Sequence, residues 1–235
     1  MFTPLTQFGL KYDTDKAYFH SFTEFYYDTF SILQDKEINI LEIWILSGAS
    51  LKMLADFFPR ATIYAIDVNE KTVNAYYGDR IKTYLCNQID FITFDRLFKD
   101  VRFDLIIDDG SHITSHQQQT LGYLFNNYLT SGGIYVCEDI HTSLWNKYVD
   151  TNQTTLDLFE KFNVDKVFKC NLLTNEQNAY LTQHIQSILI YKRTVNAYKC
   201  YKCKQVNTNN NSTCKCGTAL DPRQNPSYTS IIYKW

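Results

Sequence analysis

Acidic residues follow three short apolar segments of the sequence, at the points where each segment is predicted to end as a strand. The segments ATIYAID, FDLII and IYVC run into five carboxylates: Asp67, Asp108, Asp109, Glu138 and Asp139. In an open parallel sheet, ligands bind beyond the carboxyl ends of the strands, and neighbouring strand ends lie ~5 Å apart. Carboxylates at that distance repel one another unless some are protonated or a cation lies between them. Oxygen ligands favour a hard ion such as Mg²⁺ or Ca²⁺ over zinc, so we predict such a site, although any one acid alone could cap a helix or pair with a basic side chain.

One histidine is placed to act on a substrate beside that site. His112 stands three residues after Asp109, in the sequence DGSH, just beyond a predicted strand end. A histidine titrates near neutral pH and can accept a proton as a general base, so we predict a catalytic role for His112. Asp67 ends a different strand, where an acid in nucleotide-binding α/β folds accepts hydrogen bonds from ribose hydroxyls. As a lone signal, Asp67 is equally compatible with a helix cap.

The elements that must position these residues alternate between strands and helices along the chain of 235 residues. Strands are expected at 39–44, 61–67, 80–85, 103–107 and 134–137, and helices at 11–34, 50–58 and 115–128. This alternation predicts an α/β fold with a parallel sheet and helices on both faces. After residue 183 the pattern changes: residues 187–199 could form two short strands, and residues 228–235 a further strand. No apolar run of 18 residues occurs, so no membrane-spanning helix is expected.

Four of the seven cysteines fall within 17 residues near the end of the sequence. Cys200, Cys203, Cys214 and Cys216 form the pattern C-x2-C followed by C-x-C-G, with an Asn-rich stretch at 207–211 that we expect to be a loop. The first residues do not read as a signal peptide, so a reducing, cytoplasmic location is expected, where a cysteine cluster indicates metal more than disulfides. The pattern is similar to a zinc ribbon or knuckle, a closed structural site of four thiolates, although C-x-C departs from the commoner C-x2-C.

The charge is uneven along the chain. The net charge is −2, but residues 192–235 hold eight Lys and Arg against one acid, which gives +7 and leaves −9 for the remainder. A basic tail with Tyr198, Tyr201 and Tyr228 could contact nucleic acid. A solvated face, a docking role or a dimer-stabilising role fits these residues equally well. Nucleic acid and a second copy of the chain therefore both stay open as partners.

Longer segments are similar to the motifs of one methyltransferase group. YDTDK at 12–16, with His20 and Tyr26, resembles a YGTDK…H…Y opening, and LEIWILSGASL at 41–51 resembles a cofactor-binding loop, LEIGxxxGxSL. IDDGSH at 107–112 and EDIHTSLW at 138–145 match the motifs IDDGSH and EDxxTSxW, which are long and specific. The resemblance covers about residues 8–199. The group is the class I methyltransferases that include the metal-dependent macrolide-sugar O-methyltransferases (mycinamicin and macrocin types) and the cephalosporin hydroxylase-like proteins.

This resemblance implies a fold and an activity. The fold is a Rossmann-like class I methyltransferase domain over residues 1–199, with a mostly parallel seven-stranded sheet and helices on both faces, and a zinc-ribbon-like tail over residues 200–235. The activity is transfer of a methyl group from S-adenosylmethionine (SAM) to a sugar hydroxyl of a glycan or glycosylated small molecule, with a divalent ion such as Mg²⁺. A sugar hydroxyl is a poor nucleophile until it loses its proton, and a metal and a base both assist that loss.

The resemblance also assigns roles to residues. It implies that Asp109, Glu138 and Asp139 bind Mg²⁺, and that Asp109 and His112 are catalytic, with His112 as the base. NQID at 87–90 is similar to the family's segment near the adenine. The SAM-binding residues that the resemblance implies are Glu42, Trp44, Gly48, Ser50, Asp67, Gln88, Asp90 and Asp108. Structural Zn²⁺ on the four clustered cysteines completes the expected cofactors.

Trp44 departs from the family pattern, because it stands where the first glycine of the cofactor-binding loop belongs. That glycine normally lets the backbone approach the cofactor closely. If the loop keeps its usual path, the indole faces the amino-acid end of SAM, and we expect weak or absent SAM binding unless the indole turns away. A catalytically weak binding module is therefore one alternative, and an RNA or cap methyltransferase, suggested by the basic tail, is another. The paired acids favour hydroxyl activation on a small acceptor over base methylation.

Overall fold

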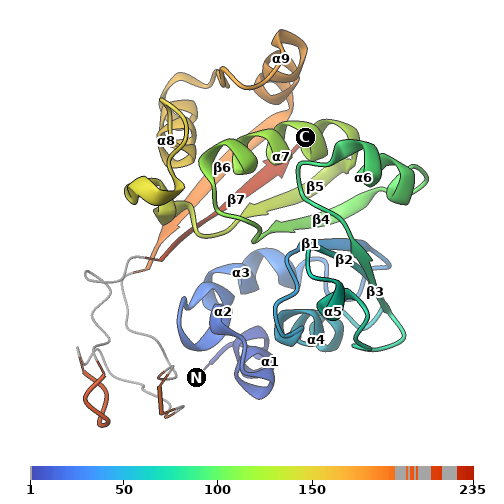
Figure 1. Cartoon of the computed structure of the whole chain (residues 1–235), viewed down its shortest axis with the longest axis vertical. Helices are drawn as coiled ribbons and strands as arrows, with labels where there is room; N and C mark the ends of the chain where they lie inside the picture. Colours follow the sequence, from blue (N-terminus) through green and yellow to red (C-terminus); the bar gives the residue numbers. More distant parts are fainter. Residues whose placement is uncertain (1, 194–199, 201, 204, 206–212, 219–226) are drawn as a thin grey trace.

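A seven-stranded sheet runs through the centre of the protein (Figure 1). The computed structural model describes residues 2–193, 200, 202–203, 205, 213–218 and 227–235. The strands are β1 (Asn39–Ile43), β2 (Thr62–Asp67), β3 (Ile81–Leu85), β4 (Phe103–Asp108), β5 (Leu129–Cys137), β6 (Ile185–Lys192) and β7 (Tyr228–Lys234). Their order is β3-β2-β1-β4-β5-β7-β6, with β1 to β5 paired in parallel and β7 antiparallel to both of its neighbours. The predicted Rossmann-like, mostly parallel seven-stranded sheet is confirmed.

The helices are α1 (Pro4–Tyr12), α2 (Asp15–Tyr18), α3 (Phe22–Ser31), α4 (Ala49–Phe57), α5 (Glu70–Val73), α6 (Phe91–Phe98), α7 (Thr114–Asn127), α8 (Thr155–Asp165) and α9 (Asn175–His184), with short 3₁₀ helices η1 (Ile140–Leu144) and η2 (Asn146–Tyr148). The expectation of one continuous helical segment at 11–34 is wrong, because the chain breaks between α1, α2 and α3. Asp13 and Ser21 have left-handed backbones there, with φ of 63° and 59°, and a left-handed residue cannot continue a right-handed helix. Among the described residues, no helix is long and apolar enough to cross a membrane.

Helices bury both faces of the sheet (Figure 1). One apolar cluster joins the sheet to α6, α7, α8 and α9, and the other joins it to α1, α3 and α4. Strand β1 shows why one strand serves both clusters, since Leu41 belongs to the first and its neighbour Ile40 to the second. Successive side chains of a strand point to opposite faces. Both faces of the sheet are therefore packed against helices, and the loops that carry the candidate site follow these buried strands.

The last strand lies inside the sheet and not in a separate tail. β7 pairs with both β5 and β6, and the four clustered cysteines occupy chain positions between β6 and β7. The boundary expected after residue 199 therefore does not separate two domains: residues 228–234 complete the sheet, and the cysteine-containing residues form an insertion within it (Figure 1). The second of the two strands expected at 187–199, the loop expected at 207–211, and Tyr198 and Tyr201 fall outside the described residues.

Candidate active site

Acidic residues gather where β4 and β5 end. The strand register pairs Asp108 with Cys137, the last residues of these two strands. The residues that follow, Asp109 after β4 and Glu138 and Asp139 after β5, therefore leave the sheet side by side. The structure thus brings the three predicted metal ligands to one edge of the sheet, as the alternating pattern of the sequence required.

Three side chains at this edge can hold a cation. One ligand atom from each of Asp109, His112 and Asp139 lies within 4.8 Å of the others, and His112 Nε2 is 3.7 Å from Asp139 Oδ2. The buried atoms Asp139 Oδ1 and His112 Nδ1 have no hydrogen-bond partner among the described residues, although buried polar atoms normally have one. Two carboxylates and an imidazole suit a divalent ion. The residues therefore fit a metal held by the two carboxylates with His112 beside it.

Lys16, from the short helix α2, is a central member of the cluster that the sequence analysis did not single out. Its Nζ lies 2.5 Å from Asp109 Oδ2, 2.7 Å from Glu138 Oε2 and 3.6 Å from Glu42 Oε1. Burial lowers the pKa of the Lys16 amine, but the facing carboxylates outweigh burial and raise that pKa well above its usual value. Lys16 is thus a buried, charged ammonium group. It holds Glu138 by one oxygen, whereas Glu138 Oε1 has no hydrogen-bond partner among the described residues.

Burial governs the protonation of the carboxylates. It raises the pKa of Glu42 to about 7, although Lys16 and Ser50 lower it. It also raises the pKa of Glu138, against the opposing effect of Lys16, and the pKa of Asp139, with a further increase from Asp109. One ammonium group does not neutralise this many buried acids, and burial favours the protonated forms of Glu42, Glu138 and Asp139. A divalent cation would displace those protons, because metal ligands bind in the deprotonated form.

Three histidines surround Asp139. His112 faces Asp139 Oδ2, while the Nδ1 atoms of His20 and His141 each lie 3.7 Å from Asp139 Oδ1. Burial lowers the pKa of all three, to about 4 for His141. The rings are therefore neutral at pH 7, and His112 is able to accept a proton. His20 and His141 lie within the motifs matched at 12–26 and 138–145.

Two predicted cofactor residues support the loop after β4. Asp108 is buried, accepts hydrogen bonds from the Tyr135 hydroxyl (2.8 Å) and the Gly110 N–H (3.2 Å), and has a pKa raised to about 7 by burial. Gln88 Oε1 accepts from the Ser111 N–H at 2.7 Å. A Cβ at Gly110 would lie 2.2 Å from Gln88 Oε1, so only glycine lets Gln88 pack there. These contacts fix the path of the loop that carries Asp109 and His112.

The other predicted cofactor residues lie at three places. Asp67 holds the β1–α4 loop, since its two oxygens accept from the N–H groups of Ile45 and Asn69 at 2.9 Å. Asp90 is exposed and caps α6. The remaining residues lie on the β1–α4 side: Ser50 Oγ donates to Glu42 Oε1 at 2.5 Å, and Gly48 (φ 72°) packs against the Tyr77 ring.

Trp44 has a left-handed backbone conformation, which glycine adopts far more readily than other residues. Its φ of 84° lies in the left-handed region, which costs a non-glycine residue on the order of 1–3 kcal/mol. The Trp44 N–H donates to the Ile66 carbonyl at 2.8 Å, which ties the loop to β2. The side chain is 40% exposed, so the indole is neither buried in the core nor fully turned out to solvent.

Trp44 borders two cavities. One, of about 270 Å³, is lined by Lys16 of α2, Glu42 of β1, residues of the β1–α4 loop, Ser50 of α4 and Asp109 after β4. The other, of about 160 Å³, is lined by residues of the β2, β3 and β4 ends, including Asp67, Gln88 and Ser111. Asp108 and Asp90 line neither cavity. An elongated ligand that used both cavities would have to pass Trp44.

Several curated relatives of this chain are O-methyltransferases named for glycosylated substrates. Mycinamicin VI 2''-O-methyltransferase of Micromonospora griseorubida is 34% identical over 152 residues, which is 60% of this chain and 37% of that protein. L-olivosyl-oleandolide 3-O-methyltransferase of Streptomyces antibioticus is 35% identical over 155 residues, 62% of this chain and 39% of that protein. The chain thus spans less than half the length of the curated relatives it matches. No protein-family model matches it.

Solved structures that superpose on this chain are also methyltransferases. The MycE methyltransferase of the mycinamycin biosynthetic pathway, in complex with Mg, SAH and mycinamycin VI, superposes with a TM-score of 0.70 at 25% identity, over 99% of this chain and 54% of that one. An O-methyltransferase from Bacillus cereus in complex with SAH shares the fold, with a TM-score of 0.51 at 12% identity over 100% of this chain and 92% of that one. Strand order and superposition define a class I methyltransferase fold. Within that class, the chain is similar to the macrolide-sugar O-methyltransferases.

Proposed function

We propose that this chain is a SAM-dependent and divalent-metal-dependent O-methyltransferase that acts on a sugar hydroxyl of a glycan or glycosylated small molecule. The observation that carries the proposal is the cluster of Asp109, His112 and Asp139, which places two carboxylates and a neutral imidazole within 4.8 Å at the carboxyl edge of the sheet. The cavity beside it is lined by Glu42 and Ser50 of the predicted SAM-binding loop. MycE, which has the same fold, was crystallised with Mg and SAH.

The metal would be held by Asp109 and Asp139, with Glu138 as the third carboxylate. Glu138 is fit for this because its Oε1 is buried and without a hydrogen-bond partner among the described residues, while Lys16 binds the other oxygen. When bound, a divalent ion lowers the pKa of a hydroxyl that it coordinates. The chain contributes the charge balance: Lys16 compensates one carboxylate and leaves the others to the ion.

His112 would remove the proton from the acceptor hydroxyl. Burial keeps the ring neutral, and Asp139 Oδ2 at 3.7 Å from Nε2 can stabilise the imidazolium that forms. The left-handed backbone of His112 (φ 60°) and the support of the loop by Gln88 and Asp108 hold the ring at the cluster. The deprotonated oxygen would then attack the donor methyl in line, forming the O–CH3 bond as the S–CH3 bond breaks and S-adenosylhomocysteine leaves with the sulfur electron pair. Fixed positions of the two reactants supply much of the acceleration.

The methyl donor would lie along the two cavities that Trp44 borders. Glu42, Gly48 and Ser50 shape the side nearer the metal cluster, and Asp67 and Gln88 the far side. Asp108 acts through the loop that it supports. Asp90, which is exposed and caps α6, reaches the donor only if the donor extends beyond the second cavity.

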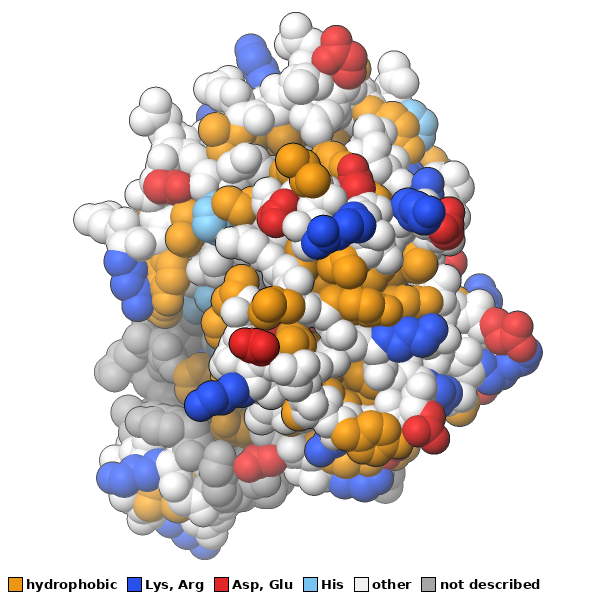
Figure 2. Space-filling model, turned by 45° about the vertical axis from the view of Figure 1, so that its right-hand side comes forward, with side chains coloured by type: hydrophobic (Ala, Val, Ile, Leu, Met, Phe, Trp, Pro, Cys, Tyr) orange, Lys and Arg blue, Asp and Glu red, His pale blue; other side chains and the backbone are white. Residues whose placement is uncertain are grey.

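A catalytically weak binding module is the second candidate function, and Trp44 is the observation that favours it. Trp44 lines both cavities, so a donor that spans both would have to pass this bulky residue. An RNA substrate has less support. On the face shown in Figure 2, Lys and Arg side chains lie scattered among Asp and Glu and do not form a continuous basic track.

Methyl transfer assays distinguish these functions. The chain is incubated with labelled SAM and either glycosylated macrolides and nucleotide sugars or RNA, with Mg²⁺ or with a chelator. Label in a sugar hydroxyl that requires Mg²⁺ supports the proposal. Label in RNA, or transfer that is indifferent to chelation, contradicts it. Binding of SAM in calorimetry without any transfer supports the binding module.

A further inference from the structure

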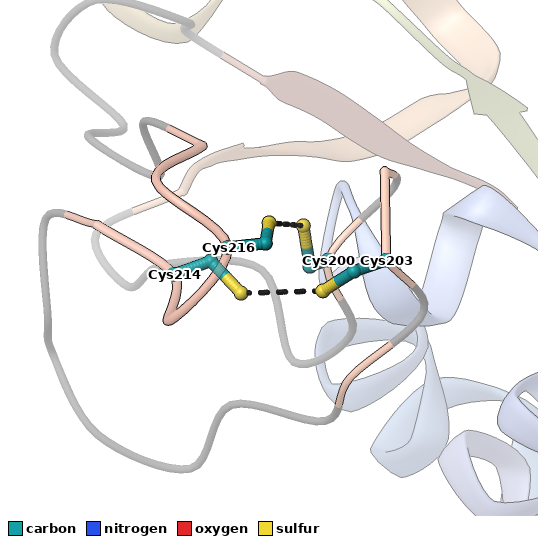
Figure 3. Close-up of side chains that lie close together, drawn as sticks. All are labelled: Cys200, Cys203, Cys214 and Cys216. Atoms are coloured by element: carbon teal, nitrogen blue, oxygen red, sulfur yellow. Dashed lines mark hydrogen bonds between the residues drawn. The ribbon is translucent and has the colours of Figure 1, made fainter.

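The four clustered cysteines meet at one point of the β6–β7 insertion, far along the chain from the acidic cluster. Cys200 Sγ lies 3.7 Å from Cys216 Sγ, and Cys203 Sγ lies 3.5 Å from Cys214 Sγ (Figure 3). All four sulfur atoms lie within 4.8 Å of one another. Figure 3 shows that Cys200 and Cys203 come from one stretch of chain and Cys214 and Cys216 from another, with their sulfur atoms pointing toward each other.

These separations are those of thiolates around one metal ion. A tetrahedral zinc site with Zn–S bonds of ~2.3 Å has sulfur atoms about 3.8 Å apart. A disulfide would require ~2.05 Å between sulfur atoms, whereas these two pairs lie 3.5 and 3.7 Å apart and all four cysteines are free. Four soft sulfur ligands favour zinc over the hard ions that suit the carboxylate cluster.

Each cysteine pair is held by its own backbone turn. The Cys200 N–H donates to the Gln205 carbonyl, and the Cys214 N–H donates to the Thr218 carbonyl, both at 2.8 Å. In the second turn the Gly217 N–H also donates to the Cys214 carbonyl. Gly217 has φ of 84° with nothing within 4 Å of a built Cβ, so the turn requires glycine for its conformation and not for space. The C-x-C-G half thus makes a turn that presents both sulfur atoms, although its spacing is shorter than C-x2-C.

The described part of the insertion lacks a core that could hold it together otherwise. Its only apolar cluster consists of two buried cysteines, Cys200 and Cys214, while Cys203 and Cys216 are exposed. The described part of the insertion therefore needs another source of stability. Metal binding supplies it, because a site that exists only in the folded state adds its binding free energy to folding.

We propose that Cys200, Cys203, Cys214 and Cys216 bind one Zn²⁺ in a closed structural site, and that this ion folds the β6–β7 insertion while the sheet folds without it. The sheet is independent because β6 and β7 pair directly from Ile185–Lys234 to Lys192–Tyr228. At the base of the insertion, the Arg193 N–H donates to the Ser227 carbonyl at 3.0 Å, which closes the strand pair without help from the metal.

The test is metal content in the wild-type chain and in cysteine variants, purified with reductant and without added metal. Cys203→Ser and Cys216→Ser each remove an exposed ligand, so neither creates a hole in a core. Cys86→Ser is the matched control, because Cys86 is a buried thiol under the sheet with a pKa raised to about 11 by burial. Elemental analysis should find one zinc per chain in the wild type and in Cys86→Ser, and much less than one in the two insertion variants.

A second measurement covers variants that fail to fold. In wild-type protein, titration with a mercurial that captures thiolates should release zinc in proportion to the four cysteines modified, and the melting temperature of the sheet should change little after release. Cobalt substituted for zinc should show the charge-transfer absorption of a tetrahedral thiolate site. Absence of zinc from wild-type protein, zinc retained in both insertion variants, or two disulfides detected under reducing conditions would each overturn the proposal.

Discussion

The replacement Lys16→Met examines the charge balance of the site directly. Methionine keeps much of the volume of the lysine stem and removes the ammonium group. The Lys16 side chain is 3% exposed and faces Asp109, Glu138 and Glu42. Loss of one partner from a buried ion pair costs about 3–5 kcal/mol. We expect the upper part of that range without metal, because two of the three partner carboxylates are themselves almost completely buried.

The loss should depend on pH with a definite sign. The folded-state pKa of Glu42 is raised to about 7 and that of Glu138 is raised further above its usual value, and Lys16 lowers both. Without Lys16 both would rise more. An acid whose folded pKa exceeds its unfolded value of ~4.3 destabilises the fold as pH rises between the two values. The variant should therefore approach wild-type stability below about pH 4 and lose most at and above pH 7.

Urea unfolding at pH 4, 5.5, 7 and 8, followed by circular dichroism, measures this dependence. Lys11→Met is the matched control, since Lys11 makes an exposed ion pair with Asp56, and little change is expected from it. Magnesium should restore part of the lost stability of Lys16→Met if the carboxylates accept the ion. A loss below 1 kcal/mol at pH 7, or a loss that does not vary with pH, would refute the reasoning.

Three further changes test the proposed chemistry. His112→Ala should leave the fold and donor affinity nearly unchanged and slow turnover by ~10²–10⁴. In the wild type, activity should persist below pH 6.5 because burial lowers the His112 pKa. An unaltered rate in the variant would assign proton removal to another residue. Asp139→Asn should weaken Mg²⁺ binding in calorimetry at least tenfold through loss of a carboxylate, and equal affinity would exclude Asp139 as a ligand. Trp44→Gly should tighten SAM binding by removing the indole. It should also raise the free energy of unfolding by about 1 kcal/mol, because glycine accepts a φ of 84° without strain. Equal, tight SAM binding by both forms would show that the indole lies outside the donor site.

The strand-end acids could be predicted from sequence because the pattern is local. Asp109, Glu138 and Asp139 each follow an apolar run directly, and a parallel sheet necessarily brings such positions together. The cysteine cluster could also be predicted from the spacing of the four cysteines alone. In both cases the residues that form the site lie next to the elements that place them.

Other parts of the site depend on contacts that no local pattern encodes. Lys16 reaches Glu138 across 122 positions of sequence, and only the breaks at Asp13 and Ser21 turn α2 toward the sheet edge. The insertion of β7 between β5 and β6 follows from pairing at the far end of the chain. Trp44 lines two cavities with a left-handed backbone conformation that tryptophan rarely adopts, which no local pattern predicts.

A crystal structure of the chain with Mg²⁺ and S-adenosylhomocysteine tests the central claim most directly. We expect one ion bound by carboxylate oxygens of Asp109 and Asp139. The homocysteine sulfur should be directed toward His112, and the ligand should extend past Trp44 toward Asp67. An ion bound elsewhere, or a cluster in which Lys16 still satisfies the carboxylates and no nucleoside occupies either cavity, would contradict it.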